Sequence, residues 1–161
     1  MQITPEQLTS PFLRAIYDYW LRVRGDRSAP ERRDIDPVNM PLKVLPYLLL
    51  VEFERNPFRV RYRLAGTNVV EMNGGEFTGK YLDEMAFPPS IGDMLHAFYL
   101  RAADTGEPIF GCYDWGLRYG GLVPVEFAIL PLLVDGSVTQ CLGAEHSAPN
   151  LPLSKDDFVD M

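Results

Sequence analysis

The clearest alternation of apolar and charged positions lies in residues 58–64, FRVRYRL, where aromatic and aliphatic residues alternate with three arginines. Such a period of two is typical of a half-buried β-strand, which places the arginines on the outer face. The apolar run at 47–53, YLLLVEF, predicts its antiparallel partner. A loop over 54–57 would place Phe53 opposite Phe58, which gives each face of the hairpin side chains of one type.

A second pattern has helical spacing and covers residues 11–25, PFLRAIYDYWLRVRG. Ser10 is a suitable N-cap, Pro11 fits the first helical position, and Gly25 marks the end. The apolar stripe of this helix has two interpretations, packing onto the domain, which the pattern favours, and a dimer interface. Its members are Leu13, Ile16, Tyr17 and Trp20.

The remaining elements complete a mixed fold. A short helix is predicted over 38–45 and a longer one over 91–105, with Gly106 as its cap. The glycine-containing turns at 120–121 and 135–136 predict three antiparallel strands in the last third of the chain. The order predicts an α+β fold, a five-stranded antiparallel sheet with the inserted helices on one face and a separate N-terminal helix.

The predicted organisation is a single domain over residues 11–147. Residues 1–10 are expected to form a loose lead-in, and residues 148–161 an acidic C-terminal tail. A chain of 161 residues has room for one domain with one core.

Composition and charge remove several classes of function. The net charge of -7 and the pI of about 4.8 argue against nucleic-acid binding, which requires a basic surface. No apolar run is long enough to cross a membrane, and residues 1–10 do not have the pattern of a signal peptide, so a cytoplasmic location is expected. The two cysteines, Cys112 and Cys141, have no metal-site spacing.

An ordered set of short motifs resembles a bacterial family of small PAS-like proteins, from about residue 17 to residue 143. The motifs are W-x-x-x-RG, P-x-R-x-DIDP, R-x-x-GT and TG. Their residues here are Trp20, Arg24, Gly25, Pro30, Arg32, Asp34, Ile35, Asp36, Pro37, Arg63, Gly66, Thr67, Thr78 and Gly79. The segment 73–76, NGGE, departs from the family, whose members carry a bulkier residue before this turn.

The resemblance implies a sensory or regulatory module without catalysis, which binds a small apolar ligand or a signalling protein. A homodimer through the N-terminal helix is also expected. No cofactor is identified by the sequence, and the interior is equally compatible with a filled core. The residues expected to line a ligand site between sheet and helices are Tyr62, Leu64, Thr67, Met72, Phe77, Met85, Met94, Phe98 and Phe127.

Two other functions remain open. A small enzyme of the conical α+β type would use Asp114, next to Trp115, as a general base with a raised pKa, which requires the carboxylate to be buried. A pure dimerisation module would use only the first helix. His96 is the only candidate axial ligand for a haem, although a surface position suits it better.

Overall fold

The structure is a computed structural model, described over residues 1–118 and 120–147. Its centre is an antiparallel six-stranded sheet with the order β1-β4-β5-β6-β2-β3. The sheet has one strand more than predicted, because Gln2–Ile3, in the segment expected to be a loose lead-in, pairs with β4. The strands are β1 (Gln2–Ile3), β2 (Leu48–Glu54), β3 (Arg59–Ala65), β4 (Ile109–Gly116), β5 (Leu122–Val134) and β6 (Ser137–Ser147).

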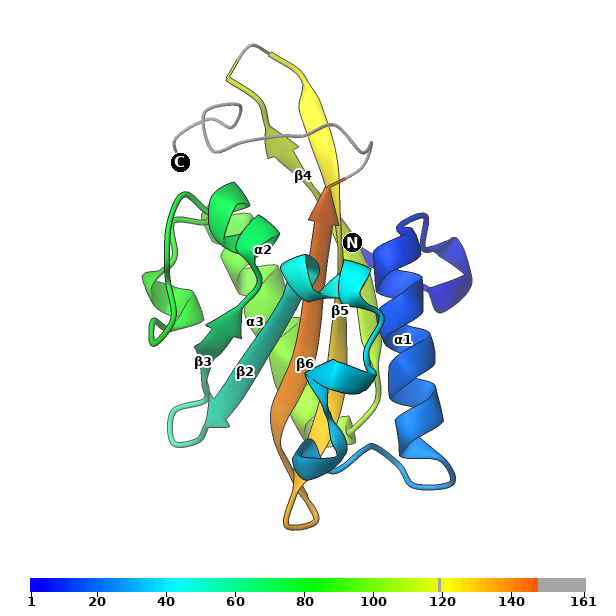
Figure 1. Cartoon of the computed structure of the whole chain (residues 1–161). Helices are drawn as coiled ribbons and strands as arrows, with labels where there is room; N and C mark the ends of the chain where they lie inside the picture. The colour runs from blue at the N-terminus through cyan, green and yellow to red at the C-terminus, as the bar shows by residue number, and fades with distance from the viewer. Residues whose placement is uncertain (119, 148–161) are drawn as a thin grey trace.

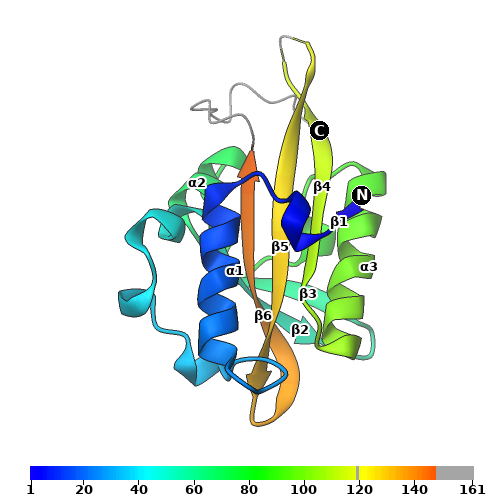
Figure 2. The same ribbon diagram turned by 90° about the vertical axis from the view of Figure 1, so that its right-hand side faces the viewer.

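Helices cover both faces of this sheet (Figures 1 and 2). Helix α1 (Pro11–Arg24) lies across one face, and α2 (Thr67–Met72) and α3 (Pro89–Thr105) lie on the other. The inserted helices therefore share one face, as predicted. Each face has its own hydrophobic cluster. We call the cluster under α2 and α3 the inner cluster and the one under α1 the outer cluster.

Helix α1 begins and ends where its capping residues predict. The Ser10 hydroxyl accepts a hydrogen bond from the Leu13 amide at 3.2 Å, and Gly25 follows the last helical residue with a positive φ. The indole nitrogen of Trp20 donates to the Pro131 carbonyl on β5 at 2.8 Å. Helix and sheet are thus joined by a buried hydrogen bond as well as by apolar packing.

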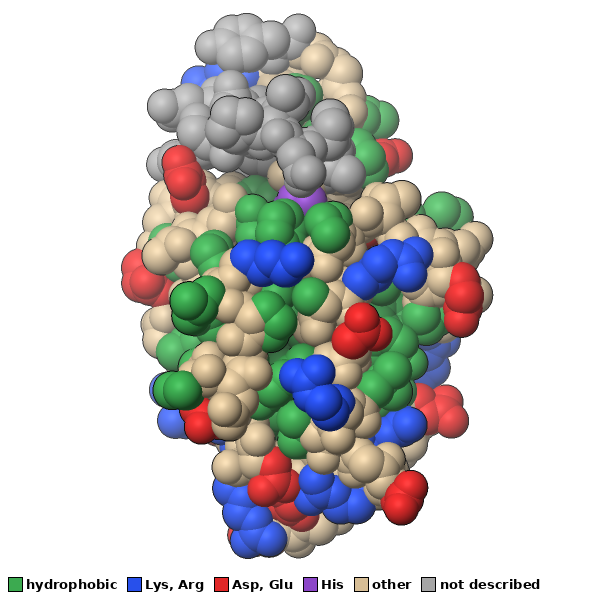
Figure 3. Space-filling view, turned by 45° about the vertical axis from the view of Figure 1, so that its right-hand side comes forward, with side chains coloured by type: hydrophobic (Ala, Val, Ile, Leu, Met, Phe, Trp, Pro, Cys, Tyr) green, Lys and Arg blue, Asp and Glu red, His purple; other side chains and the backbone are tan. Residues whose placement is uncertain are grey.

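This packing corrects the expected dimer interface. Leu13, Ile16 and Trp20 are buried in the outer cluster, and Tyr17 is half-buried against Phe110. The apolar stripe of α1 therefore packs against the sheet of its own protomer and is largely inaccessible to a second copy. On the α1 side of the molecule, cationic, anionic and apolar side chains are interspersed at the surface (Figure 3).

The β2–β3 hairpin has the predicted faces in a shifted register. Phe53 pairs with Val60 instead of Phe58, a shift of two residues that leaves each side chain on its expected face. A bulge then adds one residue to β3 beyond Tyr62, and the alternation is lost there. Leu64, expected in the core, is consequently 55% exposed.

The predicted helix over 38–45 is replaced by two 3-10 turns, Pro37–Asn39 and Leu42–Tyr47. Two prolines in this segment, Pro41 and Pro46, explain the difference, since proline interrupts an α-helix. Further 3-10 turns are Pro5–Gln7, Arg32–Asp34 and Leu82–Glu84. Over residues 1–118 and 120–147, no helix has both the length and the apolar character needed to span a bilayer.

Candidate functional site

The inner cluster contains most of the residues expected to line a ligand site. Seven of the nine belong to it or pack against it, from β3, α2, the following loop, α3 and β5. The buried members are Tyr62, Met72, Phe77 and Phe127, and the partly buried ones are Met85, Met94 and Phe98. Leu64 and Thr67 are exposed, so the structure removes both from the interior.

A glutamate lies in this apolar interior. Glu145 on β6 pairs with Phe127 on β5 and is only 4% exposed. Its Oε2 atom has no hydrogen-bond partner among residues 1–118 and 120–147. Burial raises the pKa of Glu145 to about 7, while the side-chain amide of Asn73, at the end of α2, acts in the opposite direction. A carboxyl group in this setting readily changes its protonation near neutral pH.

Tyrosines surround this carboxyl from three elements. Tyr62 on β3, Tyr99 on α3 and Tyr113 on β4 are all buried, and burial raises the pKa of each well above its usual value, with a further contribution from Glu145. Burial also raises the pKa of the Cys141 thiol. The tyrosines therefore stay neutral at physiological pH and offer hydroxyl groups as donors and acceptors.

Aromatic rings form a continuous wall beside the tyrosines. The ring of Tyr113 lies 6.1 Å from Trp115 and 6.1 Å from Phe127, measured between centroids. Phe87 approaches Trp115 at 5.7 Å, and Phe98 lies 5.9 Å from Phe127. These flat surfaces suit an aromatic or apolar ligand body.

Two glycines allow close contacts, Gly66 with the backbone of a turn and Gly111 with an aromatic ring of the inner cluster. A Cβ atom at Gly66 would lie 2.5 Å from the Pro46 carbonyl oxygen, and one at Gly111 would lie 2.7 Å from Cε1 of Phe127. Gly66 is part of the GT motif, and its amide donates to the Leu48 carbonyl at 2.7 Å. The GT motif thus serves the packing of β3 against β2 and the preceding turn.

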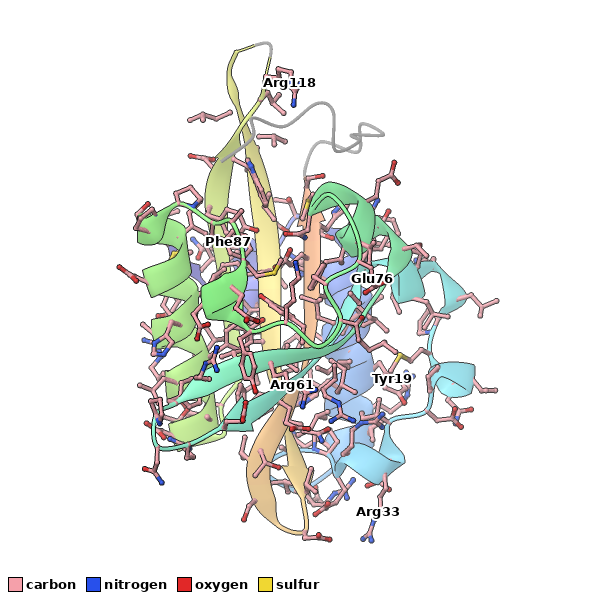
Figure 4. All side chains as sticks on the ribbon, turned by 90° about the vertical axis from the view of Figure 1, so that its left-hand side faces the viewer. Tyr19, Arg33, Arg61, Glu76, Phe87 and Arg118 are labelled. Atoms are coloured by element: carbon pink, nitrogen blue, oxygen red, sulfur yellow. The ribbon has the colours of Figure 1, made fainter. Side chains whose placement is uncertain are left out.

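Two surface pockets share residues with the rim of the inner cluster. One, of about 380 Å³, lies beside α2 and is lined by Ala65, Thr67, Val70, Glu71, Gly74, Gly75 and Glu76. The other, of about 250 Å³, lies between the Leu82–Glu84 turn and α3 and includes Met85 and Phe87. Figure 4 shows Glu76 and Phe87 on the two segments that flank the sheet on this side.

The structure contradicts the enzyme interpretation based on Asp114. This residue pairs with Pro124 near the end of β4, and its side chain is exposed on the face opposite to the buried Tyr113 and Trp115. A general base in an apolar pocket needs burial, which Asp114 does not have.

His96, the candidate haem ligand, is also exposed, and its ring makes an edge-to-face contact with Phe58. Among the described residues, no cluster of three potential metal ligands occurs.

A second buried glutamate lies on the opposite face of the sheet. Glu126 on β5 is 6% exposed and accepts hydrogen bonds from the Thr9 amide at 2.9 Å, the Thr9 hydroxyl at 2.6 Å and the Ser10 amide at 2.9 Å. These donors come from the residues that lead into α1. Glu126 therefore holds the start of α1 against β5.

Sequence reasoning did not identify Glu145, Tyr113 or Glu126. A usable signal was present for the first, because β6 places Cys141, Gly143 and Glu145 on one face by simple alternation. A charged residue at an inward position of a strand indicates either a partner or a function. The partners of Glu126 belong to residues 9 and 10, and no local pattern relates these to β5.

Comparison with known proteins identifies the family. A family model described as PAS domain (PAS_5) matches residues 8–145. No curated protein matches the chain. Among solved structures, the PAS domain of BvgS from Bordetella pertussis is 20% identical, with a TM-score of 0.43 over 65% of this chain and 77% of its own. A light-oxygen-voltage domain studied with a flavin analogue is 13% identical, with a TM-score of 0.49 over 68% of this chain and 82% of its own. The six-stranded sheet, the helices inserted between β3 and β4, and a family match over most of the chain show that this protein belongs to the PAS domain family.

Proposed function

We propose that this PAS domain is a sensory or regulatory module that binds a small molecule between the sheet and helices α2 and α3. The observation that carries the proposal is the inner cluster, where Oε2 of Glu145 and the Tyr113 hydroxyl lie among aromatic side chains and have no hydrogen-bond partner within residues 1–118 and 120–147. Buried polar atoms are almost always hydrogen-bonded in native proteins, so an unpartnered pair in one cluster supports a role in binding. The family match is consistent with this role.

Ligand binding near Glu145 would directly affect the packing of helices α2 and α3. Asn73 ends α2 next to Glu145, and Tyr99 brings α3 to the same place. Binding that reorients either side chain would alter how these helices pack on the sheet. Such a population shift between two packings is how a sensory domain passes on a signal.

We further propose that the domain acts without catalysis and in the cytoplasm. The exposure of Asp114 removes the base suggested by the sequence, and the free thiols of Cys112 and Cys141 suit a reducing compartment. Homodimerisation is kept as a proposal, with a surface other than the buried stripe of α1. Val38 and Leu42, on the 3-10 turns after α1, are exposed apolar side chains that such a contact could use.

Native mass spectrometry of the chain purified from cells tests the proposed ligand, together with a thermal-shift screen of metabolites. We expect a copurifying small molecule or a stabilising compound. The matched variants are Phe127→Leu in the inner cluster and Phe110→Leu in the outer cluster, since both rings are buried to nearly the same degree. Both should lower stability, but only Phe127→Leu should change ligand binding. A bare mass together with no shift from any compound would contradict the proposal.

A further inference from the structure

Two polar side chains, Glu145 and Tyr113, reach the inner cluster from the strands on either side of β5. Glu145 on β6 pairs with Phe127, and Tyr113 on β4 pairs with Val125. The two side chains thus enter the same face of the sheet, two residues apart along β5. Within residues 1–118 and 120–147, neither Oε2 of Glu145 nor the Tyr113 hydroxyl has a hydrogen-bond partner.

Within residues 1–118 and 120–147, no positive charge balances the carboxyl of Glu145. The groups that interact with it are Tyr62 from β3, Tyr99 from α3 and Tyr113 from β4, together with the neutral amide of Asn73 at the end of α2. Cys141 lies on the same face of β6, four residues away along the strand. An ionised carboxylate buried among neutral groups is costly unless it is paired. No described residue supplies that pairing, and a bound cation would supply it.

The aromatic side chains around Tyr113 favour an organic ammonium group over an inorganic cation. Phe87, Trp115 and Phe127 present ring faces and edges around Tyr113, and aromatic faces attract ammonium groups. An inorganic cation would need several oxygen ligands, and no cluster of three acidic, histidine or cysteine ligands occurs in the described part of the chain. An organic amine combines one positive group with an apolar body, and it fits both features.

We infer that the inner site binds a small amine, with its ammonium group donating to Oε2 of Glu145 and to the Tyr113 hydroxyl, and with its apolar body against the aromatic wall. This inference rests on the proposed function and specifies the class of ligand. A protonated amine pairs with the ionised carboxylate, so binding at neutral pH drives release of the Glu145 proton. Amine affinity should consequently rise from about pH 6 to about pH 8, the interval in which this carboxyl titrates.

Calorimetric titration of the full chain tests the inference with two matched pairs of compounds. Tryptamine is compared with tryptophol, and phenethylamine with 2-phenylethanol, so that each pair differs only in ammonium against hydroxyl. At about pH 8, we expect an amine to bind at least about tenfold more tightly than its alcohol, a typical effect for a buried charge pair. The preference should shrink at lower pH.

Variants separate the contributions of individual groups. Glu145→Gln keeps the shape of the side chain and should remove both the amine preference and its pH dependence. Tyr113→Phe, which leaves the carboxyl in place, should weaken the amines several-fold and keep the pH dependence. Glu6→Gln, an exposed glutamate in the Pro5–Gln7 turn and outside the inner cluster, is the control and should behave as the unmodified chain.

Each of the other outcomes overturns the inference in a recognisable way. If the alcohols bind as tightly as the amines, the ammonium pairing is wrong, while a ligand site in the core stands. If neither class binds at millimolar concentration and native mass spectrometry shows a different bound molecule, the amine is wrong and the proposed function stands. If neither class binds and no molecule copurifies, both are wrong.

Discussion

The two buried glutamates of this domain lie on opposite faces of the same sheet and have opposite surroundings. Glu126 faces α1 and has both carboxylate oxygens occupied by donors from Thr9 and Ser10. Glu145 faces α2 and α3 and has one oxygen without a partner in the described part of the chain. We propose from this difference that the outer face fixes the architecture and that the inner face binds the ligand.

The packing of α1 should give the largest effect. Trp20→Ala removes a fully buried indole and its hydrogen bond to the Pro131 carbonyl. Loss of a buried tryptophan typically costs about 3–5 kcal/mol of unfolding free energy, which chemical denaturation followed by circular dichroism would measure. Trp20→Phe, which restores most of the volume, should recover part of this loss. A Trp20→Ala variant as stable as the parent would mean that α1 is not packed on the sheet.

Replacement of each buried glutamate by glutamine should change the unfolding free energy by different amounts. Glu126→Gln turns an amide group toward backbone donors that need an acceptor, and we expect a loss of about 3 kcal/mol. Glu145→Gln breaks no hydrogen bond at Oε2 and removes a carboxylate whose ionisation in this interior is costly, so the variant should be at least as stable as the parent at neutral pH. Denaturation of both variants in one buffer gives the comparison. Equal losses would remove the distinction between the two faces.

Stability should depend on pH through Glu145. Its pKa is about 7 in the folded chain against 4.5 for an ordinary glutamate, so the folded state binds the extra proton between these values. The unfolding free energy therefore falls as pH rises above 4.5 and levels off above 7, by about 3 kcal/mol in total at 1.4 kcal/mol per pKa unit. Urea denaturation across this range should show that this decrease is absent from Glu145→Gln. A decrease of the same size in the variant would assign it to other groups.

A surface ion pair should give the smallest effect. Arg59 on β3 contacts both carboxylate oxygens of Asp83, at 2.7 Å and 2.8 Å. The Asp83 side chain is exposed, and that of Arg59 is partly exposed. Solvent screening makes such pairs weak. Asp83→Asn should lower the melting temperature only slightly, and added salt should reduce the difference further. A loss as large as that of Glu126→Gln would show that this pair is structurally required.

The sequence predicted those parts of the fold that depend on local pattern. Residues 58–64 alternate, Ser10 and Pro11 begin a helix, and Asp135-Gly136 turns a hairpin, and each is found where predicted. Features that depend on tertiary contacts were missed. Strand β1 forms by pairing with the edge of β4, which is distant in sequence. The bulge in β3 turns Leu64 outward, although the first residues of this strand alternate regularly.

The candidate site was predicted in its apolar part and missed in its polar part. Methionine and phenylalanine side chains between sheet and helices follow from the order of elements, and Met72, Phe77 and Phe127 are buried there. The carboxyl of Glu145 acquires its character from burial beneath elements that are distant in sequence. Neither that burial nor the missing partner can be read from neighbouring residues.

A carboxyl-carbon NMR titration of Glu145 in the full chain tests the central claim most directly, with Glu145→Gln used to assign its signal. We expect a midpoint near pH 7, because the carboxyl is buried and no described residue places a positive charge beside it. A midpoint near 4.5, the value of an ordinary glutamate, would mean that the carboxyl is solvated or already paired. That result would contradict the assignment of the inner face as the binding face.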